Sequence, residues 1–158
     1  MRRPLSFVTL MTLLGAGACG GGSAGEPLLS TTLTGHFQGH AFTPTSGVAT
    51  VYQGSNVIAV GDGPLNCASA QQNDPPMGTT ATFSLPALDV GTYSAVFVDL
   101  IQYQARNFDG FGSSDATVML TAVNASSVTG TIAYSYTDTS TGDAYDLSGN
   151  FEVSRCPM

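Results

Sequence analysis

The sequence is poor in charge, and in positive charge above all. Only 9% of its 158 residues are charged, well below the usual ~25%, and the chain has no lysine and four arginines. Arg2 and Arg3 stand at the start, whereas all 11 acidic residues lie beyond Cys19, so the chain from Cys19 onward carries a net charge near −9. Binding to nucleic acid requires a basic surface that neutralises phosphates. We therefore expect no nucleic-acid partner.

The apolar run at the N-terminus is too short to cross a bilayer. It extends over about ten residues, from Leu5 to Leu14, whereas a spanning helix takes about 20. Two arginines precede it and only glycine and alanine follow it, at positions 15–18. That order is typical of a secretory signal peptide. We therefore expect residues 1–18 to be a signal peptide and the remainder to be exported.

The end of this segment resembles the lipobox of bacterial lipoproteins. Gly17 and Ala18 fit the two small positions before the cysteine of that family, and Ala16 stands where the family favours leucine. The resemblance implies that Cys19 is lipidated and that the lipid attaches the protein to a membrane. The alternative is ordinary secretion with cleavage after Ala18.

The layout beyond Cys19 resembles that of small β-rich envelope lipoproteins of Gram-negative bacteria. Residues 19–28 form the lipidated cysteine and a glycine- and serine-rich tether, a composition that behaves as flexible coil, and residues 29–158 suit one β-domain. Some lipoproteins of this kind are retained in the inner membrane by an aspartate after the cysteine. Here that residue is Gly20, so the resemblance implies the outer membrane.

Two cysteines remain once Cys19 is assigned to the lipid. They are Cys67 and Cys156, and exported domains with two cysteines usually pair them. We therefore predict a disulfide that closes a loop of about 90 residues. The chain-entropy relation gives such a bond roughly 4.5 kcal/mol of stabilisation.

The pattern of the domain is that of strands, with little helical signal. Apolar runs recur between glycine, proline, asparagine and aspartate at intervals typical of sandwiches and barrels. In the clearest run, 127–137, Val128, Ile132, Tyr134 and Tyr136 fall on one face and hydroxyl side chains on the other. We predict an all-β domain, a single antiparallel β-sandwich of about eight or nine strands. The alternative is an up-and-down, lipocalin-like β-barrel.

A second long run, 91–103, is apolar on both faces. Tyr93, Phe97, Ile101 and Tyr103 share one face, and three aliphatic residues line the other. In a barrel, Phe97 together with Tyr134 and Tyr136 could line a cavity for a ligand, because aromatic rings with hydroxyl groups suit small-molecule sites. Packing in a protein core is the alternative role of these side chains.

Metal binding has a weak candidate in an acidic, glycine-rich segment. We interpret 107–115 as a loop in which Asn107, Asp109 and Asp115 could bind Ca²⁺ through oxygen atoms. The spacing does not match an EF-hand, and the alternative is ordinary turn chemistry. His36 and His40 flank a two-residue turn at Gln38 and Gly39, so their side chains should diverge rather than share a metal.

No motif indicates an enzyme. The sequence contains no G-x-S-x-G nucleophile motif and no glycine-rich phosphate loop. A hydrolase with an acidic site, which needs two carboxylates in one cleft, is the least favoured function. The long segment 61–79 is either a binding loop or an insertion held by the disulfide.

Two functions stay open. The first is a membrane-anchored envelope module that binds a protein or a glycan through its loops, with exposed aromatics such as Phe108 and Phe111. The second is a carrier of a small apolar or aromatic ligand inside a barrel.

Overall fold

The structure is a computed structural model that describes residues 30–72, 77–104 and 107–157, without the side chains at 30, 72, 104, 107 and 108. The proposed signal peptide, Cys19, the tether and Arg106 lie outside the described residues. Within the described part, no helix is both long enough and apolar enough to cross a membrane.

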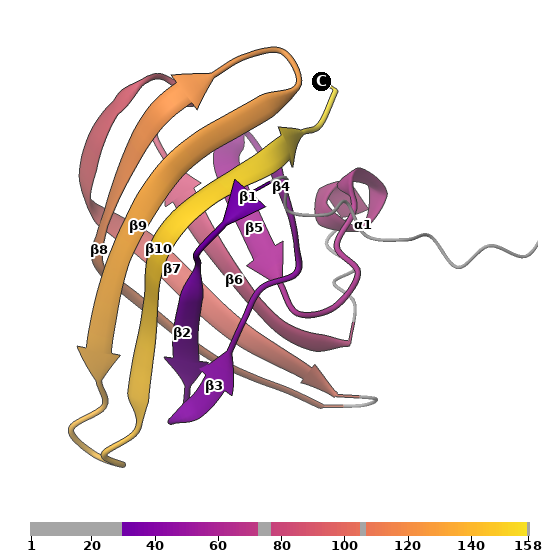
Figure 1. The fold of residues 1–158 in the computed structure, drawn as a ribbon. Coiled ribbons are helices and arrows are strands. Elements are labelled where there is room, and N and C mark those ends of the chain that lie inside the picture. The colour runs from indigo at the N-terminus through magenta and orange to yellow at the C-terminus, as the bar shows by residue number, and fades with distance from the viewer. Residues whose placement is uncertain (1–29, 73–76, 105–106, 158) are drawn as a thin grey trace, which may run out of the picture.

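The described chain forms ten strands and one short helix (Figure 1). In chain order the elements are β1 (Ser30–Thr31), β2 (Thr34–Phe37), β3 (His40–Phe42), β4 (Ser46–Tyr52), β5 (Ser55–Gly61), α1 (Cys67–Gln72), β6 (Gly78–Leu85), β7 (Gly91–Gln104), β8 (Asn107–Val123), β9 (Ser127–Thr137) and β10 (Ala144–Arg155).

Strands β4 to β10 close into an up-and-down barrel (Figure 1). Each is antiparallel to the one before it, and Ser154 and Arg155 of β10 then pair in parallel with Val48 and Ala49 of β4. The parallel pair follows from the odd number of strands, because the first and the seventh strand of an alternating series point the same way. Strands β1 and β2 pair with β10, and β3 pairs with β2.

The all-β prediction is thus confirmed, in its barrel alternative rather than as a two-sheet sandwich. Closure needs strongly coiled strands, and β-bulges supply local twist. The register shifts in the β7–β8 ladder and again at Leu120 and Ala122 in the β8–β9 ladder.

The barrel interior is filled by packed apolar side chains. Phe83 and Phe151 are fully buried there and meet edge to face, with ring centroids 5.6 Å apart. A Cβ on Gly130 would stand 2.9 Å from the ring of Phe151 and 2.5 Å from the carbonyl oxygen of Met119. The glycine therefore leaves room for the ring and for the neighbouring strand.

Strand β7 follows the predicted alternation with one exception. Val96, Val98 and Leu100 point into the core, and Phe97, Ile101 and Tyr103 line the outer wall. Tyr93 was predicted to share a face with the latter three residues, but it packs against the core. The cause is a bulge at Ala95, whose φ is 54°, and the register shifts between Tyr93 and Val96. The extra residue reverses the face of every residue before it.

The segment predicted as an acidic loop, 107–115, is part of strand β8. It pairs with β7, for example Gly112 with Asp99 and Gly110 with Ile101. A Cβ on Gly112 would lie 2.5 Å from the ring of Phe97. The glycines that suggested a loop instead leave space beside bulky residues of the neighbouring strand, which is the physical reason for the correction.

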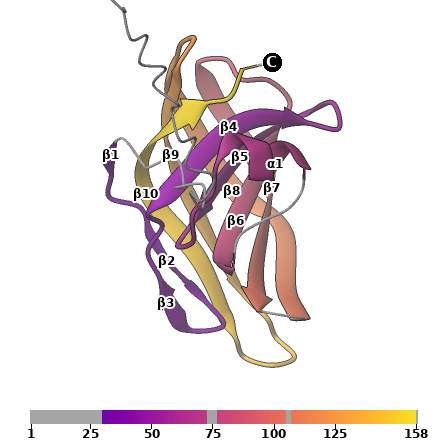
Figure 2. The same cartoon turned by 90° about the vertical axis from the view of Figure 1, so that its right-hand side faces the viewer.

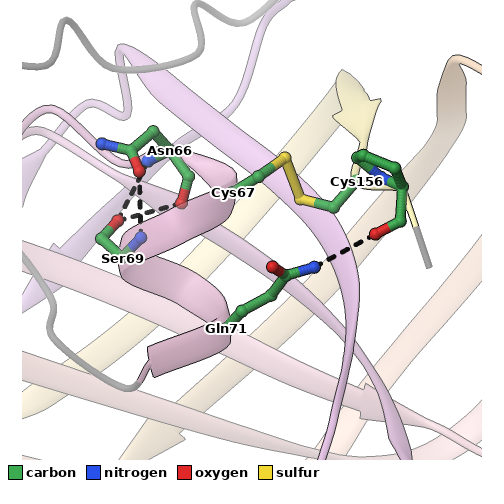
Figure 3. The surroundings of a disulfide bond; sticks show 6 residues. Asn66, Cys67, Ser69, Gln71 and Cys156 are labelled. Carbon is green, nitrogen blue, oxygen red and sulfur yellow. Dashed lines mark hydrogen bonds between the residues drawn. A yellow bond between two sulfur atoms is a disulfide. The ribbon is translucent and has the colours of Figure 1, made fainter.

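The helix α1 lies outside the barrel, over the wall formed by β4 and β5 (Figure 2). It is capped reciprocally: Asn66 Oδ1 accepts from the backbone N–H of Ser69 at 2.9 Å, and Ser69 Oγ accepts from the N–H of Asn66 at 3.1 Å (Figure 3). This helix was not predicted from the sequence.

The predicted disulfide between Cys67 and Cys156 is confirmed (Figure 3). Cys67 is the first residue of α1, and Cys156 directly follows β10, with its N–H donating to the carbonyl oxygen of Ala49 at 2.8 Å. Gln71 Nε2 also donates to the carbonyl oxygen of Pro157 at 3.2 Å. The bond therefore fastens the helix to the place where the barrel closes.

Candidate functional site: a groove on the outer barrel wall

A groove of about 240 Å³ lies on the outer wall of the barrel. Outward-facing residues of β4 to β7 line it, and Leu65, Ser69 and Ala70, from α1 and the segment before it, form its other side. Pockets for drug-sized ligands measure ~300–1,000 Å³, so this groove suits a smaller molecule. The segment 61–79 thus does contribute to a candidate binding site.

Strand pairing arranges the groove residues in rows, because directly paired residues point to the same face of a sheet. One row leads from Thr50 through Val57 and Ser84 to Phe97. The next leads from Ala59 through Thr82 to Asp99, and a third from Gly61 through Thr80 to Ile101. Asp99 therefore lies opposite Thr82 and between Phe97 and Ile101 along its own strand.

Two threonine hydroxyls in this groove are buried without a partner. Thr50 and Thr80 are each 4% exposed, and among the described residues neither Oγ1 atom has a hydrogen-bond partner. Ser46 on the same wall differs, because its Oγ accepts from the N–H of Leu65 at 3.0 Å and donates to the carbonyl oxygen of Gly63. A buried hydroxyl without a bond costs about 1–3 kcal/mol. Buried polar groups are normally satisfied, so the exceptions point to a missing partner.

Aromatic rings accompany the hydroxyls. Phe97 is 46% exposed although it is a large apolar side chain, and Tyr52 and Tyr103 line the same groove. Exposed rings of this kind offer a flat apolar face, and tyrosine adds a polar tip. The groove therefore combines apolar contact area with hydrogen-bonding groups.

Asp99 supplies the charge of the groove. Its carboxylate is partly buried and forms no hydrogen bond or ion pair within the described part of the chain. Burial raises the pKa of Asp99 because it disfavours the ionised form. Burial also raises the pKa of the Tyr103 hydroxyl, and the negative charge of Asp99 raises it further. The two side chains are therefore close enough to interact electrostatically.

Replacing Asp99 by asparagine is expected to stabilise the protein at neutral pH. The pKa of Asp99 is raised in the folded state, so its ionised form destabilises the fold above that pKa, and the penalty vanishes as the pH falls below its ordinary value of 3.8. We expect a gain of under about 1 kcal/mol at pH 7, because solvent screens this partly open group. Urea unfolding of the wild type and of the variant between pH 3 and 7 measures this difference in the free energy of unfolding. A variant less stable than the wild type at pH 7 would show that Asp99 has a stabilising partner.

The residues predicted to bind a ligand together lie in different places. Phe97 lines the outer groove, whereas Tyr134 is buried inside the barrel, with its hydroxyl 3.1 Å from Ser113 Oγ. Tyr136 stacks on Phe111, with ring centroids 4.5 Å apart, and Phe111 stacks on Tyr145. Phe111 is therefore a half-buried member of an aromatic stack, and the side chain of Phe108 lies outside the described residues.

The residues proposed for calcium are also spread out. Asp109 and Asp115 are six residues apart in an extended strand, roughly 20 Å at the usual rise, and the side chain of Asn107 is not described. Asp109 Oδ2 accepts from Gln38 Nε2 at 2.7 Å. Over the described ranges, no group of three or more His, Cys, Asp and Glu could hold a metal ion.

A second acidic segment, 138–146, has local hydrogen bonds. Asp138 Oδ1 accepts from the N–H and the hydroxyl of Ser140 at 2.7 and 2.6 Å, bonds that lower the pKa of Asp138.

The two histidines do not share a site. His36 Nδ1 lies 2.9 Å from Asp146 Oδ2. Phe37 pairs with His40 and His36 pairs with Ala41, so the two histidines lie on opposite faces of the sheet, as predicted.

The comparisons give no relative from which a site could be transferred. The chain matches no protein-family model, no curated protein and no solved structure. What the fold and the groove define is a small closed β-barrel with a lateral cleft on its outer wall.

Proposed function

We propose that the protein is a lipid-anchored module of the bacterial envelope that binds a glycan in the groove on its outer wall. The lipobox-like segment ending at Cys19 and the tether of residues 20–28 support the anchor, the envelope location and the outer-membrane destination. The protein partner that the sequence left open is the less favoured occupant, because the groove is small.

The unpaired hydroxyls of Thr50 and Thr80 are the observation that carries this proposal: neither oxygen is exposed to solvent or bonded to a described residue, so a sugar would bond to them once the two side chains rotate toward the groove. A sugar ring has hydroxyl groups around its rim that donate and accept hydrogen bonds, and a threonine hydroxyl does both. Its C–H face is apolar and can lie on an aromatic ring such as that of Phe97, which is exposed beside these threonines. A single sugar unit also suits the size of the groove.

Two observations favour this function over the alternatives. The carrier needs a cavity inside the barrel, but Phe83, Phe151 and Leu147 occupy the interior and are fully buried. Hydrolysis at an acidic site needs two carboxylates, and Asp99 is the one carboxylate among the described residues that line the groove. We therefore propose binding without catalysis.

A double substitution, Thr50→Val with Thr80→Val, tests the proposal. Each valine keeps the shape of threonine and removes a hydroxyl that has no partner in the described protein, so we expect unchanged or slightly higher stability. Sugar binding should weaken at least about tenfold, because two hydrogen bonds to the ligand are lost. Calorimetric titration of the exported protein with short β-linked glucose and glucosamine oligomers measures binding, and urea unfolding measures stability.

Ser46→Ala is the matched control for this experiment. Its hydroxyl is bonded within the protein, so its loss should lower stability by about 1 kcal/mol and leave sugar binding unchanged. A wild-type protein that binds none of these oligomers, or a folded double variant that binds them as tightly as the wild type, would contradict the proposed function.

A further inference from the structure

We infer that the ligand of this groove carries a positively charged amino group and that Asp99 is its counter-ion. The inference rests on the proposed function and specifies it: the glycan contains a sugar with a free amine. The relevant chemistry is that of an organic ammonium group beside a carboxylate and aromatic rings.

The carboxylate of Asp99 has no opposite charge beside it among the described residues. It lies opposite Thr82 and next to Phe97 and Ile101, and none of these side chains carries a charge. No hydrogen bond or ion pair holds its carboxylate within the described residues. Burial without a partner disfavours the ionised form, and an opposite charge within ~4–6 Å restores it. A bound ammonium group would supply that charge.

The protein offers few cations of its own. It has no lysine, and beyond residue 19 its arginines are Arg106, outside the described residues, and Arg155. The guanidinium of Arg155 donates to the carbonyl oxygen of Asn124 at 3.1 Å, away from the residues that line the groove. With a net charge near −9 beyond Cys19, the domain attracts cations and repels anionic ligands.

The rings of the groove favour an organic cation over a metal ion. An ammonium group is attracted to the face of an aromatic ring within about 6 Å, and Phe97 and Tyr103 line the groove on either side of Asp99 in the sequence. Calcium prefers six to eight oxygen ligands, several of them carboxylates, whereas the described lining has one carboxylate. A neutral sugar would leave Asp99 without a partner.

The test compares two oligomers whose nitrogen is either a free amine or an uncharged acetamide. The exported protein is titrated with a tetramer of β-linked glucosamine and with the same tetramer N-acetylated, at a pH where the free amine is protonated. We expect the wild type to bind the free amine at least about tenfold more tightly, because a charge-assisted hydrogen bond is added. Asp99→Asn should bring the two affinities to within about twofold of one another.

Asp89→Asn is the matched control. Asp89 is exposed and is not among the residues that line the groove, so this variant loses the same charge elsewhere and should keep the preference for the free amine. Spermidine serves as an amine that is not a sugar.

The outcomes separate this inference from the proposed function. Equal binding of both tetramers by the wild type would overturn the ammonium inference and leave glycan binding in place. Binding of spermidine alone would support the ammonium group and overturn the sugar as its source. No binding of either tetramer or of spermidine would overturn both proposals.

Discussion

Replacing Cys67 and Cys156 together by alanine is expected to lower the free energy of unfolding by roughly 4.5 kcal/mol and to abolish binding in the groove. The disulfide joins residues 89 positions apart, and chain-entropy reasoning assigns a loop of that length this stabilisation. It also holds α1, which has six residues and is too short to be stable by itself. Ser69 and Ala70 would lose their places in the wall of the groove.

Urea unfolding of the double variant measures the change, and the wild type in reductant should give the same value. Asn66→Ala is the control, because it removes the cap of α1 but keeps the disulfide and should lower stability by about 1 kcal/mol. A disulfide-free protein that loses less than about 1 kcal/mol and still binds ligand would show that α1 is held by packing alone.

Phe151→Ala is expected to lower the free energy of unfolding by about 3–5 kcal/mol, as buried phenylalanines in cores do. Phe151 is 1% exposed and packs against Phe83 inside the barrel. Phe97→Ala changes the same residue type on the opposite side of the wall, where it is 46% exposed. It should lower stability by under about 1 kcal/mol but weaken ligand binding at least about tenfold.

The two variants distinguish a ligand site in the groove from a ligand site inside the barrel. Both are measured by urea unfolding and by titration with the glucosamine tetramer, with Phe151→Ala kept under conditions where it is folded. Loss of binding in a folded Phe151→Ala protein, together with unchanged binding in Phe97→Ala, would reverse the assignment and point to a site inside the barrel.

Local patterns in the sequence were sufficient for much of the secondary structure. The alternation in 127–137 predicted β9 with its observed bounds. The Gln38–Gly39 pair predicted the first hairpin with its register, because both residues adopt positive φ values, 50° and 75°. The pairing of Cys67 with Cys156 followed from the export signal and the number of cysteines.

Closure of the barrel was not predictable in the same way. It depends on Ser154 and Arg155 reaching β4, more than 100 residues earlier in the chain, and nothing in the local pattern of either strand specifies a partner at that distance. Segment 107–115 was wrongly predicted to be a loop because it contains Gly110 and Gly112. The space that these glycines leave is used by residues of β7. Composition alone does not distinguish that use from a turn.

The candidate site was predicted only in part. Phe97 was named, but with Tyr134, which points to the other side of the wall. Thr50 and Thr80 went unnoticed, because a threonine in a strand is ordinary and only the three-dimensional packing shows that its hydroxyl has no partner.

The pattern Asn66-x-x-Ser69 is one signal that could have revealed α1, since it is a variant of the capping box.

The location of the bound ligand tests the account most directly. The exported protein, labelled at its methyl groups, is titrated with the glucosamine tetramer and followed by nuclear magnetic resonance. We predict that the methyl signals of Val57, Leu65 and Ile101, which line the groove, shift with the ligand. Those of Val98 and Leu147, inside the barrel, should stay in place. Shifts at Val98 and Leu147 with the groove signals unchanged would contradict it.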